Sequence, residues 1–101
     1  MTENEILEDA CLTLEQLCTA AALEHDWLIR HVEEGFIPVT FAVSGTAVAE
    51  WRFTTLHIAR ARRMNEIERI YAAEPELAAL VADMLEEMDQ LRARLRNTRL
   101  R

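Results

Sequence analysis

The residues of this sequence most suited to bind a metal ion or act as a nucleophile are three histidines and two cysteines. They are His25, His31, His57, Cys11 and Cys18. No pair among them has the spacing of a zinc motif, and two thiols seven residues apart form neither a metal signature nor a disulfide framework. We therefore expect neither a metal ion nor a cofactor.

Catalytic constellations are also missing. Ser44 and Cys18 have no identifiable base and orienting acid, as a nucleophile requires. His25 and Asp26 are adjacent, but neighbours on a helix point in different directions and do not form a catalytic dyad. There is no glycine-rich phosphate loop. The sequence therefore predicts a protein that is not an enzyme.

Acidic side chains are the other chemistry that the sequence offers, and they are concentrated in its first half. The chain carries 18 acidic and 11 basic residues, a net charge of −7, and every basic residue is arginine. Ten acids and one arginine give the first 50 residues a charge of −9, and the rest of the chain carries +2. Such a charge repels nucleic acid and anionic membranes and attracts basic proteins.

Length and composition limit the elements that can position these groups. A chain of 101 residues is the size of one domain. We expect a single domain over 1–101, with a core at 13–72 and a C-terminal helix at 76–97. Two glycines and two prolines supply little turn chemistry, so most of the chain is expected to be helical. No signal peptide and no membrane span are recognisable, which favours a cytoplasmic protein.

Two short helices are predicted near the start of the chain. Thr13 and Gln16 fit a capping box before a helix from Leu14 to about Ala22. A second helix is predicted from about Glu24 to Glu34, ending at Gly35. The expected inward residues of the two helices are Leu14, Leu17, Cys18, Ala21, Trp27, Leu28, His31 and Val32. This pair predicts a helix-turn-helix.

Two β-rich runs follow, at 36–43 and 47–53, on either side of the turn 44–46. They predict a hairpin, the wing of a winged helix-turn-helix. Thr54 caps a third helix through about 72, with Arg60, Arg62 and Arg69 largely outward and Arg63 partly covered. Pro75 then separates this helix from the last one.

The last helix has an apolar repeat with alternating spacings of four and three residues. The repeat consists of Leu77, Val81, Met84, Met88, Leu91 and Leu95. Over about three heptads it matches the seam of a coiled coil, and Leu80 and Leu85 widen it. Two interpretations stay open: a seam for a homodimer, or a helix packed only on its own core.

The predicted second helix carries the acidic residues Glu24, Asp26, Glu33 and Glu34 with only Arg30 opposing them. In a winged helix-turn-helix this helix would enter the DNA major groove, where such charge would be repelled by phosphate. The acids either make the surface soluble or bind a basic protein. Trp27 and Trp51 are candidate interface anchors, although Trp51 is expected in the core beside Phe53.

Four arginines could contact a DNA backbone: Arg52, Arg60, Arg62 and Arg63. The favoured alternative is a solvated helix face that pairs with neighbouring acids, because DNA binding normally shows a concentrated basic footprint.

The order of four segments resembles the CbpM family of chaperone modulators, which is related to MerR-type winged-helix proteins. The segments are 12–18 (LTLEQLC), 32–37 (VEEGFI), 51–53 (WRF) and 85–95 (LEEMDQLRARL). The resemblance implies a mainly α fold: a MerR-like winged helix-turn-helix with a small β-hairpin and a long C-terminal helix.

The resemblance also implies a function. A member of this family would bind the J-domain of a CbpA-like (DnaJ-like) co-chaperone and inhibit its stimulation of a DnaK-type chaperone ATPase. We take Glu24, Asp26, Glu33 and Glu34 as candidate contacts for that basic domain. Two alternatives stay open: a MerR-like DNA-binding transcriptional regulator, and a coiled-coil adaptor.

Overall fold

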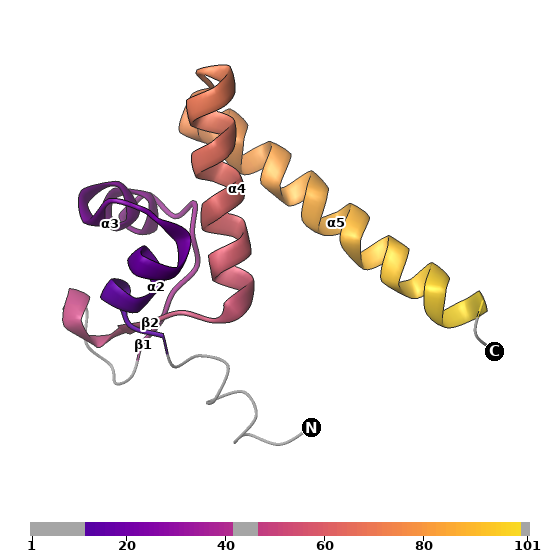
Figure 1. Ribbon diagram of the computed structural model, residues 1–101, viewed down its shortest axis with the longest axis horizontal. Helices are drawn as coiled ribbons and strands as arrows, with labels where there is room; N and C mark the ends of the chain where they lie inside the picture. The colour runs from indigo at the N-terminus through magenta and orange to yellow at the C-terminus, as the bar shows by residue number, and fades with distance from the viewer. Residues whose placement is uncertain (1–11, 42–46, 100–101) are drawn as a thin grey trace.

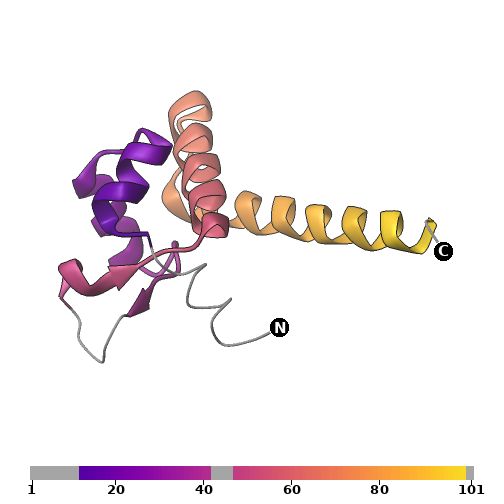
Figure 2. The same ribbon diagram turned by 60° about the horizontal axis from the view of Figure 1, so that its bottom comes forward.

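The structure is a computed structural model that describes residues 12–41 and 47–99. Its order is α2 (Leu14–Ala21), α3 (His25–Glu33), β1 (Thr40–Phe41), the 3₁₀ turn η1 (Val48–Glu50), β2 (Trp51–Arg52), α4 (Thr55–Tyr71) and α5 (Pro75–Arg99). Helices α2 and α3 and the two strands lie on one side of α4, and α5 leaves the end of α4 and projects away from them (Figure 1). The view turned by 60° shows the same projection of α5 (Figure 2). The mainly α winged helix-turn-helix is confirmed.

Helix α2 begins at the predicted capping box. The Gln16 amide donates to the Thr13 hydroxyl at 3.1 Å, and the Thr13 amide donates to the Gln16 side chain at 2.9 Å. The helix ends one residue early, because Ala22 adopts a left-handed conformation with φ of 56°. The expected inner face of α2 is buried, from Leu14 to Ala21.

Helix α3 turns its predicted apolar side to the core. Leu28, His31 and Val32 are buried, and Trp27 is half-buried. After the helix the chain reverses at Gly35, whose φ of +86° lies in the left-handed region that favours glycine. The predicted end of this helix at Gly35 is therefore confirmed.

The wing is shorter than predicted. Strand β1 pairs antiparallel with β2, with Thr40 opposite Arg52 and Phe41 opposite Trp51. The expectation of one continuous β run over 47–53 is wrong, because the Glu50 amide donates to the Ala47 carbonyl and closes a 3₁₀ turn. Residues 36–39 also form no strand. The predicted turn 44–46 lies outside the described residues.

Helix α4 is the centre of the domain. Thr54 caps it as predicted, and Ala61 and Met64 are its buried residues. Two apolar residues of α4 lie on its outer side instead: Leu56 is 79% exposed and Ile70 is 62% exposed. The core against α4 includes Leu17, Leu28, Ile37, Phe53 and Met64, the largest of the fully buried side chains.

Helix α5 begins at Pro75 and continues to Arg99, slightly beyond the predicted 76–97. It packs on the domain through small side chains, Ala78, Ala79 and Ala82, which are almost fully buried. Small residues let two helices approach closely, so this short contact sets where α5 departs from the domain.

Candidate partner-binding surfaces

The predicted acidic residues lie on the solvent side of α3 and at its two ends. Glu24 is the N-cap, Glu34 is the C-cap, and both are exposed, as are Asp26 and Glu33. Asp26 and Glu33 are seven residues apart, so they share one side of the helix. Arg30 is exposed on that same side between them. The structure therefore brings the set together on one short helix with a net negative charge.

The inner edge of this surface is a polar network that links α3 to α4. Trp27 Nε1 donates to Glu68 Oε1 at 3.0 Å, and His31 Nε2 lies 2.7 Å from Glu68 Oε2. The other ring nitrogen of His31 lies 2.8 Å from the Trp27 carbonyl oxygen. Both ring nitrogens of His31 thus face oxygen atoms, so the ring bridges the backbone of α3 and the Glu68 side chain.

Glu68 was missed by the sequence analysis. His31 was expected to face inward, and it is buried, but nothing near it in the sequence identifies the acceptor that its ring requires. The only local signal is the pairing of Trp27 and His31, two ring N–H donors one helical turn apart. Such a pair requires an acceptor, but it does not indicate which element supplies that acceptor.

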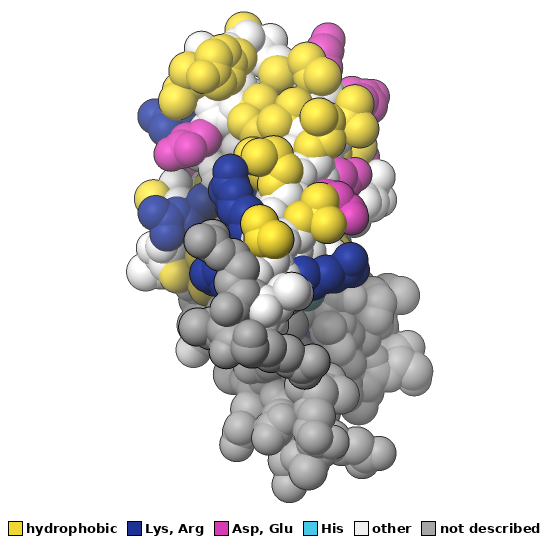
Figure 3. Space-filling model, turned by 90° about the vertical axis from the view of Figure 1, so that its right-hand side faces the viewer, with side chains coloured by type: hydrophobic (Ala, Val, Ile, Leu, Met, Phe, Trp, Pro, Cys, Tyr) yellow, Lys and Arg dark blue, Asp and Glu magenta, His cyan; other side chains and the backbone are white. Residues whose placement is uncertain are grey.

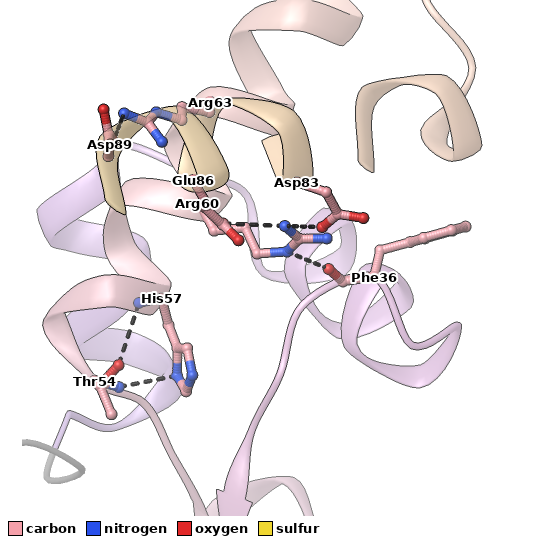
Figure 4. Close-up of polar contacts among 8 residues, drawn as sticks. All are labelled: Phe36, Thr54, His57, Arg60, Arg63, Asp83, Glu86 and Asp89. Carbon is pink, nitrogen blue, oxygen red and sulfur yellow. Dashed lines mark hydrogen bonds and ion pairs between the residues drawn. The ribbon is translucent and has the colours of Figure 1, made fainter. Parts of the chain in front are cut away.

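The prediction that the Arg60 side chain points outward is wrong. Its side chain is 11% exposed, and its guanidinium holds three oxygens, as Figure 4 shows. Nε donates to the Phe36 carbonyl at 2.7 Å, and Nη1 donates to Asp83 and Glu86 at 2.8 and 3.0 Å. The reason is that α5 packs over this side of α4 and supplies the two carboxylates. Arg60 therefore links α4 to α5 and to the segment that follows α3.

The other candidate arginines have mixed environments. Arg63 is partly covered as predicted, and its Nη2 donates to Asp89 at 2.7 Å. Arg52 donates from Nη1 to the backbone carbonyls of Ala49 and Trp51. Arg62 is exposed. Three of the four arginines proposed for a DNA backbone thus bind oxygens of this chain.

An apolar cleft of about 340 Å³ lies in the angle between α4 and α5. Its lining includes Pro38, Leu56, Ala59 and Gln90, together with the ion-paired side chains of Arg60, Arg63, Glu86 and Asp89, which Figure 4 labels. The hydrogen bond from Arg63 lowers the pKa of the Asp89 carboxyl at its rim.

The apolar repeat of α5 lies away from the contact with α4. Met84 and Met88 are 56% and 42% exposed, and Val81 is half-buried. The remaining members are also exposed: Leu77, Leu91 and Leu95. Leu80, which widens the repeat, is 54% exposed. Figure 3 shows the side of the molecule toward which α5 projects, and hydrophobic side chains gather on the upper part of that side. Five of the six predicted seam residues are thus exposed in the part of the chain that the structure describes.

Three further observations limit the chemistry. Within 12–41 and 47–99, no three His, Cys, Asp or Glu side chains are grouped to hold a metal ion. None of the described helices is both long and apolar enough to cross a membrane. Trp51 is buried as expected and packs edge-on against Phe53 at 6.4 Å between ring centroids.

Comparison with known proteins adds a family. Residues 12–100 match the family described as "MerR HTH family regulatory protein". The chain is also 32% identical over 82 residues to "Chaperone modulatory protein CbpM" of Pseudomonas entomophila (strain L48), covering 81% of this chain and 77% of that protein. No solved structure matches the chain.

Proposed function

The chain belongs to the CbpM family of MerR-like helix-turn-helix proteins, and from this premise we propose that it is a cytoplasmic chaperone modulator. It binds the J-domain of a CbpA-like co-chaperone and inhibits the co-chaperone's stimulation of a DnaK-type chaperone ATPase. It does so by occupying a surface and without catalysis or a cofactor.

The observation that carries this proposal is the charge of α3. In a helix-turn-helix the second helix is the one that reads DNA, and here its exposed side carries Asp26 and Glu33, with Glu24 and Glu34 at its ends. Phosphate would be repelled by this surface, whereas a basic protein helix would be attracted to it. A J-domain with a basic helix fits that requirement.

The exposed repeat of α5 supports a homodimer as the acting form. A row of uncovered leucine and methionine side chains on a projecting helix is typical of a helix–helix interface. We propose that Leu77, Val81, Met84, Met88, Leu91 and Leu95 form the seam with a second copy.

Charge along α5 favours an antiparallel arrangement of the two copies. The first half of the helix carries acids, among them Glu76 and Glu87, and the second half carries Arg92, Arg94 and Arg96. A parallel pair would set arginine against arginine, whereas an antiparallel pair sets each arginine-rich half against an acidic half.

Calorimetric titration against a CbpA-type J-domain at low salt tests the function. The wild-type chain is expected to bind, and to lower co-chaperone-stimulated ATP hydrolysis by the chaperone while leaving its basal hydrolysis unchanged. Glu33→Lys should weaken binding several-fold, because it reverses a charge on the α3 surface. Glu66→Lys, an equal change at an exposed position of α4, is the matched control and should bind as the wild type does.

The rival DNA-binding function makes the opposite prediction. A duplex bound in gel-shift assays, with affinity that falls steeply as salt rises, together with no heat from the J-domain, would replace the modulator by a regulator. Arg62→Glu would then abolish the shift, since Arg62 is exposed on α4.

A further inference from the structure

The indole of Trp27 is held in one orientation by its neighbours. Its Nε1 donates to Glu68 at 3.0 Å, and its ring stacks on the His31 imidazole with 3.8 Å between centroids and 22° between planes. His31 is only 4% exposed and lies on the core side, whereas Trp27 is half-buried. The accessible part of the indole is therefore the side turned away from His31, and its plane is set before any partner arrives.

An exposed carboxylate lies beside this aromatic face. Glu24, the N-cap of α3, precedes Trp27 by three residues, so it lies on the indole's side of the helix and on the side of the ring away from His31. Arg30, three residues after Trp27, is the one arginine of this stretch. A flat π face beside a carboxylate attracts a cation through both the ring quadrupole and the negative charge.

We propose that the outer face of Trp27 is the receptor for an arginine or lysine side chain of the protein partner. Glu24 is the carboxylate that accompanies the cation, and Glu68 and His31 position the ring. The inference rests on the proposed function and names the residue that anchors the partner on α3. A phosphate backbone is disfavoured here, because the carboxylate would repel it.

The Trp27 ring is suited to this role because it is preorganised for binding. Tryptophan is the residue most enriched among those that dominate binding energy, and it loses little freedom on binding when its ring is already fixed. The stack on His31 and the bond to Glu68 supply that fixation. The acids alone would attract any basic protein, whereas a fixed ring recognises a side chain at a defined place.

Fluorine NMR of the chain labelled with 5-fluorotryptophan tests the contact without altering the sequence. Trp51 is buried at 5% exposure and serves as the internal reference, and the two signals are assigned with Trp27→Phe. Saturating J-domain is expected to shift the Trp27 signal and leave the Trp51 signal in place.

A variant series gives the second readout. Trp27→Ala should weaken J-domain binding about tenfold or more, the typical effect at a dominant interface residue. Trp27→Phe keeps an aromatic face and should bind with intermediate affinity. Leu56→Ala removes an apolar side chain of α4 that is 79% exposed, and it should bind as the wild type does. Circular dichroism establishes that each variant is folded.

The outcomes separate the two proposals. Wild-type binding with no change in the Trp27 signal, or with full affinity in folded Trp27→Ala, overturns this inference and leaves the proposed function standing. If Trp27→Ala fails to fold, the fluorine spectrum of the wild type decides alone. If the wild type gives neither heat nor a shift with the J-domain, the proposed function fails and the inference fails with it.

Discussion

His57 closes the first turn of α4 in a manner that depends on its protonation state. Its Nδ1 accepts a hydrogen bond from the Thr54 amide at 3.0 Å, and a protonated imidazole has no lone pair there. Burial lowers the pKa of His57 below its ordinary value of 6.5, the Glu86 carboxylate opposes this shift, and the Arg60 guanidinium adds to it. The neutral ring is therefore the form that the fold favours.

The free energy of unfolding should decrease as the pH is lowered, because of this residue. Since the folded pKa of His57 lies below the unfolded one, the unfolded chain binds more protons as the pH drops. The contribution of the neutral ring is fully present above the unfolded pKa of about 6.5 and is lost as the pH falls from there toward the folded pKa. Denaturant unfolding of the wild type and His57→Gln at about pH 7.5 and 5.5 measures it.

Glutamine is the matched replacement, because Gln16 already performs the same role for Thr13 in α2. We expect His57→Gln to keep the cap and to lose less stability on acidification, by up to about 1 kcal/mol, the usual worth of a cap. Equal losses in both proteins would show that His57 does not contribute to the pH dependence.

Cys18 is a buried thiol of the core. Burial raises its pKa, and the nearby Glu15 carboxylate raises it further. The reactive thiolate is therefore scarce at neutral pH. In the Cys11→Ser variant, we expect reaction with a disulfide reagent to be slow in the folded chain and fast in denaturant; rapid labelling of the folded chain would contradict the burial.

Among elements, α2 and α4 share an unusual ending. Ala22 and Ala72 follow them with φ of 56° and 53°, a conformation in which an alanine side chain crowds the backbone. Glycine suits this position after a helix. Ala72→Gly should therefore raise the free energy of unfolding by about 1 kcal/mol, measured by denaturant titration.

The control for that change is the same substitution inside α4. Ala59 is exposed in the helix, so Ala59→Gly should lower the free energy of unfolding by about 1 kcal/mol. Opposite signs at the two positions test the backbone argument, whereas destabilisation at both would refute it.

At the scale of the whole molecule, α5 has two apolar sides with different partners. Ala78 and Ala82 are fully buried against the chain's own domain, and the larger side chains of the repeat are exposed. A helix that packed only on its own core would turn its largest apolar residues inward. The observed distribution instead favours a second copy on the outer side.

Negative charge introduced into the seam by mutation should dissociate the proposed dimer. We expect the wild type to sediment as a dimer and Met84→Glu/Met88→Glu as a monomer, because an interface would bury two unpaired carboxylates in each copy. Gln90→Glu adds a negative charge at an exposed position of α5 outside the seam and should leave the dimer intact. A wild type that sediments as a monomer at high concentration would refute the seam.

Much of the fold could be read from local signals. Thr13 and Thr54 precede α2 and α4, Gly35 follows α3, and Pro75 begins α5, all close to the predicted limits. The wing was harder to predict, since 47–53 contains β-favouring residues and still folds partly as a 3₁₀ turn. Caps depend on neighbours a few residues apart, whereas a strand depends on a partner elsewhere in the chain.

The sequence by itself determined where helices begin and end, that the exposed side of α3 is acidic, and that α5 carries an apolar repeat. Only the tertiary structure decided that α5 covers Arg60 and that Glu68 orients Trp27 and His31. The physical reason is the distance along the sequence over which each kind of interaction acts. Helical periodicity and capping act within a few residues, whereas the partners of a buried polar group come from whichever distant elements the packing brings together.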